Sequence, residues 1–386
     1  MAVAATTTTP QLRAGTGQWV SSARWDLFWM FAALWGSALC AAAWFAFGSA
    51  RVGAVLIPVG VLVAVCHSWS TTYVVLASPV LRDARRRNRT KFTVVPAVVV
   101  AASLALGWAI GVSGGLPKQF PLTSAQSLWV LYLGLFWVGH FWHFGNQDFG
   151  VLSIYRAKAG QGSLRERKID KAYAVAMMFV IQPAVYLKAV SRSPLSEAVW
   201  SFVPVSRAAV AIAAAWAVAA AVGLTVAVVV YELRKDRLSL PKLCYYAVML
   251  SHPVVLYFVH WRLAFFYLVV YFWSHWLIAI GLVGRIHTNY QRATGASPGV
   301  ALLRHATRLG AFVLVAGAFY EQFGDYSVFS GNDYKEVLSA VWPDWTGVIG
   351  LVLGAFLAEQ LLHYYCDRCL FRFRDPDVRR AVAPLL

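Results

Sequence analysis

Six of the nine histidines in this sequence fall inside long apolar stretches, where an ionisable side chain is costly and usually has a functional role. Imidazole binds metal ions through a ring lone pair and carries protons near neutral pH. The six come from five different apolar stretches, so we expect them to converge on one site. They are His67, His140, His143, His252, His275 and His363. The pattern predicts a metal centre, with a proton relay or haem ligation as the alternatives.

Two of these histidines share a polar segment, GHFWHFGNQDFG (139–150), in an otherwise apolar stretch. His140 and His143 are three residues apart and so share one face of a helix, as two ligands from one helix must. Gln147 lies one turn beyond His143 on that face, and Asp148 lies two turns beyond His140. We expect both histidines to be metal ligands and Asp148 to be a further ligand or a partner of one.

Carboxylates also accompany the last histidine at helical spacing. His363 and Asp367 are four residues apart, which allows a shared metal site or a ligand with its orienting carboxylate. Glu359 lies one turn before His363, and we expect it either to join the site or to pair with a buried arginine or tyrosine. Cys366 and Cys369 have metal-like spacing, but no second cysteine pair completes a thiolate site.

Histidine-rich ligation with carboxylates suits non-haem iron, copper or zinc. We expect iron, with copper or zinc as alternatives, because iron supports oxygen chemistry on lipid-soluble substrates whereas zinc would suggest hydrolysis. The candidate ligands outnumber what one iron needs, so the centre would hold one or two ions. The expected partners are dioxygen, a hydrophobic or lipid-like small molecule held among the aromatic residues of the histidine segments, and an electron donor for any reductive step.

The elements that must carry these residues are apolar helices. Of the 386 residues 59% are hydrophobic and 13% charged, whereas a soluble domain carries about 25% charged residues. Several apolar runs reach about 20 residues, the length that crosses a bilayer as a helix. We expect an all-α, polytopic integral membrane bundle of about ten transmembrane helices. The predicted spans are 27–48, 53–78, 93–113, 127–152, 172–190, 207–232, 243–260, 263–284, 302–320 and 346–366.

Basic residues gather in alternate loops, which predicts an even number of spans with both termini cytoplasmic. The formal net charge of +17 is thus mostly a topology signal that favours membrane lipids, and it argues against nucleic acid because it is spread over five short segments. This orientation places the six histidines in the cytoplasmic half of the membrane. His287 and His305 lie near that face, where their membership of the site stays open, and His260 lies at the outer end. The basic segments are 82–91, 156–171, 234–242, 285–299 and 367–380.

We expect three regions along the chain: a flexible polar N-terminal tail (1–25), a single transmembrane helical domain (26–366) and a basic cytoplasmic C-terminal tail (367–386). The N-terminal segment lacks the basic start, apolar core and cleavage site of a signal peptide.

One segment carries a resemblance. HFGNQD (143–148) is similar to the HFGxxD-type segment of bacterial Brp/Blh-type β-carotene dioxygenases, which are polytopic iron enzymes. The resemblance implies an iron centre with histidine ligands, His143 at the corresponding position, oxidative cleavage of a polyene and location in a bacterial inner membrane. The segment LHYYCDRCLFRFRDPDVRR (362–380) resembles the end of a family of uncharacterised bacterial membrane proteins, which implies no chemistry.

These observations predict a membrane-embedded non-haem iron oxygenase or oxidoreductase. The alternatives are a proton- or metal-ion-coupled transporter and a haem or quinone redox protein. A transporter would place polar residues on a path to both faces, whereas here they gather in one half of the membrane. Stacked haems would need facing histidine pairs in both halves, and the outer half offers only His260.

Overall fold

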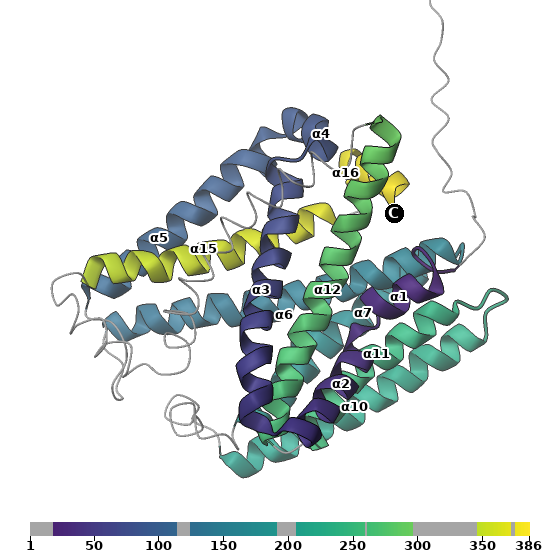
Figure 1. Cartoon of the computed structure of the whole chain (residues 1–386), viewed down its shortest axis with the longest axis horizontal. Helices are drawn as coiled ribbons and strands as arrows, with labels where there is room; N and C mark the ends of the chain where they lie inside the picture. Colours follow the sequence, from purple (N-terminus) through teal and green to yellow (C-terminus); the bar gives the residue numbers. More distant parts are fainter. Residues whose placement is uncertain (1–17, 114–123, 191–205, 259–260, 296–345, 372–374) are drawn as a thin grey trace, which may run out of the picture.

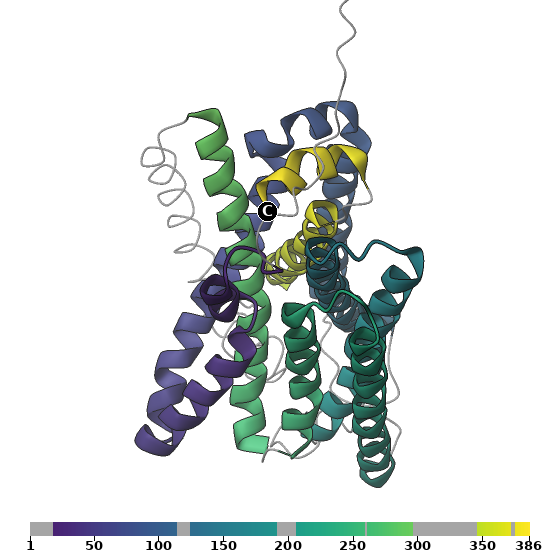
Figure 2. The same cartoon turned by 90° about the vertical axis from the view of Figure 1, so that its right-hand side faces the viewer.

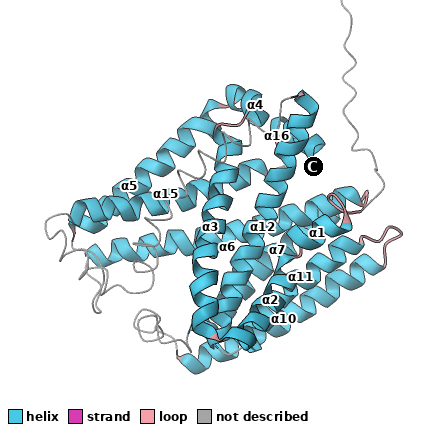
Figure 3. Cartoon of the chain, in the orientation of Figure 1, coloured by secondary structure: helices cyan, strands magenta, loops and turns pink. Residues whose placement is uncertain are grey.

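The computed structural model describes residues 18–113, 124–190, 206–258, 261–295, 346–371 and 375–386, and all regular structure within them is helical (Figures 1 and 3). The all-α prediction is confirmed for this part of the chain. The predicted span 302–320, His260 and His305 lie outside the described residues.

Most predicted spans correspond to helices. Those nearest the candidate site are α3 (Ser49–Leu76), α5 (Val95–Val112), α6 (Ser124–Lys158), α11 (Leu240–Phe258), α12 (Trp261–Thr294) and α15 (Thr346–Leu370). The remaining α-helices are α1 (Ala23–Trp29), α2 (Ala32–Phe47), α4 (Arg82–Arg87), α7 (Leu164–Val175), α8 (Gln182–Val190), α10 (Arg207–Leu233) and α16 (Pro376–Val382). Short 3-10 turns are η1 (Pro79–Leu81) and η4 (Ala383–Leu385), and the π-helical segments η2 (Thr90–Val94) and η3 (Ala176–Ile181) precede α5 and α8.

Local sequence explains several helix boundaries. Ser163 begins α7 with a capping box, in which its hydroxyl accepts from the backbone N–H of Glu166 and the Glu166 carboxylate accepts from the Ser163 N–H. Ser206 caps α10, because its hydroxyl accepts a hydrogen bond from the backbone N–H of Ala209. Gly48 separates α2 from α3 with a φ of 79°, a left-handed conformation that favours glycine.

Three helical segments within the described residues are long and apolar enough to cross a membrane: Thr90–Val112, Leu164–Ala189 and Arg207–Leu233. The α1–α2 pair, bent by 58°, would be a fourth if it formed one span. The chain therefore fits a membrane location, with fewer helices meeting this test than the ten spans expected from sequence.

The helices that carry the candidate site cross one another. Figures 1 and 2 show α3 and α12 running alongside each other, with α6 and α15 approaching this pair from the side in Figure 1. α3 packs against both α12 and α15, and α15 packs against α6. α6 is 35 residues long, about 52 Å at 1.5 Å per residue, so it extends well beyond the site in both directions.

Small residues hold α15 tightly against α5. A Cβ atom at Gly107 of α5 would collide with the backbone oxygen of Gly350, and one at Gly354 would lie 2.6 Å from the backbone oxygen of Ser103. One at Gly350 would lie 2.9 Å from the Cα of Gly111. The residues on each helix recur at four-residue spacing, the small-xxx-small pattern that lets two membrane helices touch backbone to backbone. This seam fixes the position of α15, which carries His363 and Asp367.

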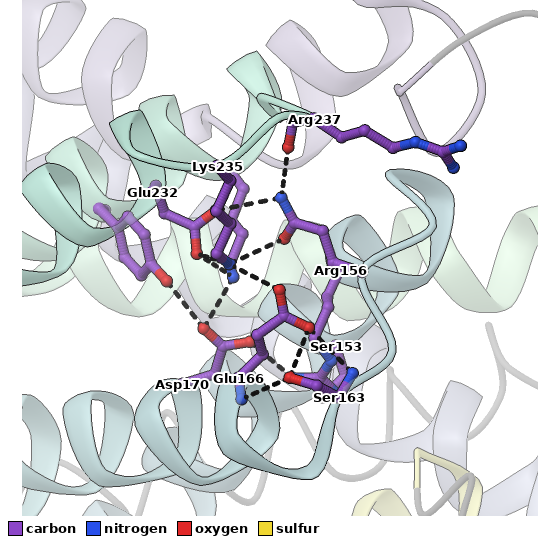
Figure 4. Close-up of polar contacts among 11 residues, drawn as sticks. Ser153, Arg156, Ser163, Glu166, Asp170, Glu232, Lys235 and Arg237 are labelled. Carbon is purple, nitrogen blue, oxygen red and sulfur yellow. Dashed lines mark hydrogen bonds and ion pairs between the residues drawn. The ribbon is translucent and has the colours of Figure 1, made fainter.

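A buried ion network joins α6, α7, α10 and α11 (Figure 4). The Lys242 ammonium is fully buried and contacts Asp170 at 2.9 Å and Glu232 at 2.7 Å. Arg156 pairs with Asp170 at 2.5 Å, and Lys235 bridges Glu232 and Glu166. Burial alone would lower the pKa of Lys235, but its bonds to the two glutamates outweigh this effect and raise the pKa above its usual value.

Both ends of the described chain pack against the helical bundle. Val20, within the expected N-terminal tail, is 1% exposed, and α16, within the expected C-terminal tail, buries Val378 and Val382 completely. α16 is tied to the basic segment 82–91 by Lys91–Asp375 (2.6 Å) and Arg87–Asp377 ion pairs. Burial alone would raise the pKa of the Asp375 carboxyl, but Lys91 outweighs this and lowers it. α15 continues to Leu370, so Asp367 lies in a helix.

The α5–α15 seam predicts opposite effects for two Gly→Ala substitutions. Gly107→Ala should lower stability by at least about 1–3 kcal/mol, because the new methyl group overlaps the backbone of α15. Gly223→Ala on α10, where a Cβ meets nothing within 4 Å, should raise stability by up to about 1 kcal/mol through helix propensity. Thermal unfolding in detergent measures both, and equal effects would contradict the seam.

The ion network predicts a large cost for removing its central cation. Lys242→Met should destabilise the protein by about 1.5–3 kcal/mol, because Asp170 and Glu232 lose their shared buried cation and keep only Arg156 and Lys235 as charge partners. Arg87→Met is the matched control, since its ion pair with Asp377 is exposed and should contribute about 0–1 kcal/mol. Similar losses for both variants would argue against a structural role of the network.

Candidate metal centre

Four of the predicted histidines meet at one point, each from a different helix. His67 comes from α3, His143 from α6, His275 from α12 and His363 from α15, and each lies well inside its helix. One ring nitrogen from each of the four lies within 4.8 Å of the corresponding nitrogens of the others. All four side chains are buried, between 1% and 6% exposed. This group could hold a metal ion.

The spacing suits a single ion. The Nε2 atoms of His143 and His275 are 2.9 Å apart, and the ring of His67 lies 4.2 Å from that of His363 and 4.9 Å from that of His275, centroid to centroid. Metal–imidazole bonds are about 2.0–2.1 Å long, so ligands on opposite sides of one ion lie about 4.2 Å apart. The four ring nitrogens lie within 4.8 Å of one another, so the group as a whole is slightly more open than a closed coordination sphere.

His67 gives the clearest sign of a missing partner. Its side chain is 1% exposed, and neither ring nitrogen has a hydrogen-bond partner among the described residues. A buried polar atom without a partner costs about 1–3 kcal/mol. A metal ion would take the free lone pair of a neutral imidazole, so the orphaned ring fits a ligand role.

A carboxylate adjoins the group. Asp367, 2% exposed, places one oxygen 3.6 Å from His143 Nε2 and the other 3.6 Å from His363 Nδ1. The hydroxyl of Thr71, one turn beyond His67 on α3, lies 3.1 Å from the same His363 Nδ1. Because Nδ1 is engaged there, His363 would offer Nε2 to a metal. Asp367 could coordinate an ion directly or orient its imidazole ligands.

Neighbouring side chains fix the rings and keep the site apolar. Phe144 stacks on His275 at 3.6 Å and Tyr364 stacks on His143 at 4.6 Å, centroid to centroid. The Gln147 side-chain amide donates to the backbone oxygen of His275 at 2.9 Å, which ties α6 to α12 beside the site.

His140 and His143, from the segment 139–150, have different surroundings. His143 joins the group, whereas His140 Nδ1 lies 3.1 Å from the hydroxyl of Tyr364 and its ring packs on Phe144. Residues three apart share a broad helix face, but they differ by about 60° in direction and about 4.5 Å in height. That offset turns His140 toward α15 rather than into the four-histidine group.

The other predicted ligands lie outside the group. Asp148 accepts a 2.5 Å hydrogen bond from Tyr245 of α11, and Glu359 accepts one from the Gln360 amide, also at 2.5 Å. His252 is buried with its ring 4.3 Å from that of Tyr271.

His287 also lies apart from the group, with its ring 5.8 Å from that of Tyr73.

Three contributors near the site were not predicted from sequence: Thr71, Tyr364 and Tyr245. Thr71 is four residues after His67, so helical spacing from a candidate ligand was an available signal. The two tyrosines lie in aromatic-rich segments where composition alone does not single out one ring.

Comparison with protein-family models, curated proteins and solved structures finds no match to this chain. The similarity of HFGNQD to the dioxygenase segment therefore rests on those six residues alone.

The orphaned ring of His67 predicts a stability effect that changes sign with metal. In chelator-treated protein, His67→Leu should raise stability by about 1–3 kcal/mol, because it removes an unsatisfied buried polar group. In metal-loaded protein the same substitution should lower stability, because it removes a ligand and with it the stabilisation by binding. Thermal unfolding with and without chelator measures both.

His140→Leu is the matched control, because His140 already has a partner in Tyr364 and lies outside the group. It should lower stability under both conditions. A His67→Leu effect of the same sign in both would contradict a metal role for this ring.

Proposed function

We propose that the protein is an integral membrane oxygenase or oxidoreductase with one non-haem iron held by His67, His143, His275 and His363. One observation carries the proposal: four buried imidazoles from four helices present their ring nitrogens to a common point. Asp367 is the adjoining carboxylate, as a fifth ligand or as the partner of His143 and His363.

The donor set favours iron. Four imidazoles with a carboxylate nearby offer more donors than the tetrahedral zinc site needs, and they suit a six-coordinate ion that keeps open positions. Cys366 and Cys369 flank Asp367 in sequence, yet neither belongs to the group, so no thiolate selects zinc or copper(I).

The geometry also favours one ion over two. Within the described residues, the four histidines are the single group of metal-ligating side chains close enough to hold an ion. Asp148 and Glu359, which would be needed for a second ion, are bonded to Tyr245 and Gln360 instead.

Iron, when bound, would supply the activation of dioxygen. The chain's own residues then have four tasks: the histidines hold the ion, Asp367 orients the rings of His143 and His363, Gln147 ties α6 to α12, and Phe144 and Tyr364 exclude water. The aromatic surroundings suit a hydrophobic, lipid-like substrate. A polyene is the substrate class that the HFGNQD resemblance suggests.

The membrane setting is part of the proposal. We infer about ten spans with both termini on the cytoplasmic side of a bacterial inner membrane, on the evidence of alternating loop charge. A lipid-soluble substrate could then reach the site from within the bilayer.

A haem protein fits these contacts less well. Two axial imidazoles must face each other across a porphyrin, whereas the ring of His143 lies 4.7 Å from that of His275 and 4.8 Å from that of His363. No gap for a macrocycle separates them.

Metal analysis of the full-length protein, purified in detergent after growth with iron, tests the proposal. We expect about one iron per chain, a loss of at least about tenfold in iron affinity for His143→Ala or His275→Ala, and about 10–100-fold weaker binding for Asp367→Asn. Oxygen uptake with a carotenoid-type polyene tests the reaction.

His140→Ala should retain the metal, because this ring lies outside the four-histidine group. Less than about half an equivalent of any transition metal, with no change on replacing His143, would refute the metal site. One equivalent of zinc in iron-replete protein would refute the oxygen chemistry.

A further inference from the structure

Two buried tyrosine–carboxylate pairs lie next to each other beside the histidine group. The Tyr245 hydroxyl donates to Asp148 at 2.5 Å, and the Tyr155 hydroxyl donates to Asp26 at 2.9 Å. All four side chains are at most 7% exposed. The two tyrosine rings are 6.2 Å apart, centroid to centroid, so the two pairs are neighbours in an apolar core, and we call these four residues the polar strip.

The Asp148 end of this strip is linked to the four-histidine group through the neighbouring residue Gln147. Asp148 follows Gln147, whose amide nitrogen donates to the backbone of His275. The second oxygen of Asp148 and the side-chain oxygen of Gln147 are both buried and have no hydrogen-bond partner among the described residues. Each open acceptor costs free energy and leaves an oxygen beside the strip that can accept a proton.

The outer end lies just below the surface. Asp26 is completely buried and accepts from the backbone N–H groups of Val20 and Ser21. The adjoining residues 21–24 are exposed, and Arg285 donates to the Ser21 hydroxyl.

α6 sets the direction of the strip. His143, Asp148 and Tyr155 follow one another along this helix, and Asp148 and Tyr155 are seven residues apart, which places them on one face two turns apart. The distance from His143 to Tyr155 along the axis is about 18 Å.

We propose that Asp26, Tyr155, Tyr245 and Asp148 form a proton path between the surface near the start of α1 and the histidine group. Each transfer breaks one O–H bond and forms another, so protons move along the path and no electrons do. A proton that leaves the Asp148 carboxyl toward the histidine group is replaced from the Tyr245 hydroxyl. Tyr245 then regains a proton from Tyr155, Tyr155 regains one from Asp26, and Asp26 regains one from water. The path rests on the proposed function only for the fate of the protons it delivers.

Infrared spectroscopy of the full-length protein in lipid vesicles tests the path without any metal. The carboxylic-acid carbonyl band of Asp148 is assigned by its loss in Asp148→Asn, and its shift on transfer to D2O reports exchange of that one proton. Tyr155→Phe and Tyr245→Phe should slow the exchange at least about tenfold, because each removes a hydroxyl from the strip.

Tyr246→Phe is the matched control. Tyr246 is the next residue on α11, is equally buried and also donates to a carboxylate, but that carboxylate is Asp170 of the ion network. In Tyr246→Phe, the Asp148 proton should exchange at the same rate as in the unsubstituted protein. The path is overturned if no Asp148 carboxylic-acid band exists at any pH at which the protein is folded. It is equally overturned if the three tyrosine variants exchange alike.

Metal content and proton exchange are measured separately, so the two proposals can fail separately. Iron bound in normal amounts with unchanged exchange in Tyr155→Phe would refute the path alone. Slowed exchange in a protein that binds no metal would support the path and refute the iron chemistry.

Discussion

The structure depends most on the meeting of four neutral imidazoles at a point that water does not reach. Each ring has a lone pair and an N–H to satisfy, and His67 satisfies neither from the described residues. For the four rings to meet, the helices α3, α6, α12 and α15 must cross at the level of their histidines, and each must turn its histidine-bearing face toward the other three. The close α5–α15 seam serves the same end, because it fixes the helix that carries both His363 and Asp367.

Charged and neutral polar groups occupy different parts of their helices. Arg156, Glu232 and Lys242 lie within three residues of a helix end, where their ion network joins α6, α10 and α11. The four clustered histidines lie many residues from either end of theirs. A full charge is most costly at the centre of a bilayer, whereas a neutral imidazole is tolerated there if its nitrogens find partners. The ion network can thus stabilise the bundle without disturbing the electrostatics of the site.

Composition and hydrophobic run length were enough to predict an all-α chain, and all four histidines of the group were among the six predicted ligands. Sequence could not separate these four from His140 and His252, because depth along a span says nothing about the rotation of each helix about its axis. Tertiary packing sets that rotation, and it turns His140 to Tyr364. The 58° bend between α1 and α2 and the π-helical segments before α5 and α8 are likewise products of packing that hydropathy does not signal.

Charge balance distinguishes Asp367 from the other buried carboxylates. Four neutral imidazoles supply no negative charge, so a divalent cation among them would carry its full charge into an apolar bundle, at a cost only a nearby anion can offset. Asp367 lies 3.6 Å from nitrogens of two ring ligands, whereas Asp148 is bonded to Tyr245. A carboxylate that compensates a fixed cation must stay ionised, and one that relays protons must gain and lose them. The two aspartates can hold these opposite roles within one site because only one of them adjoins the four-histidine group.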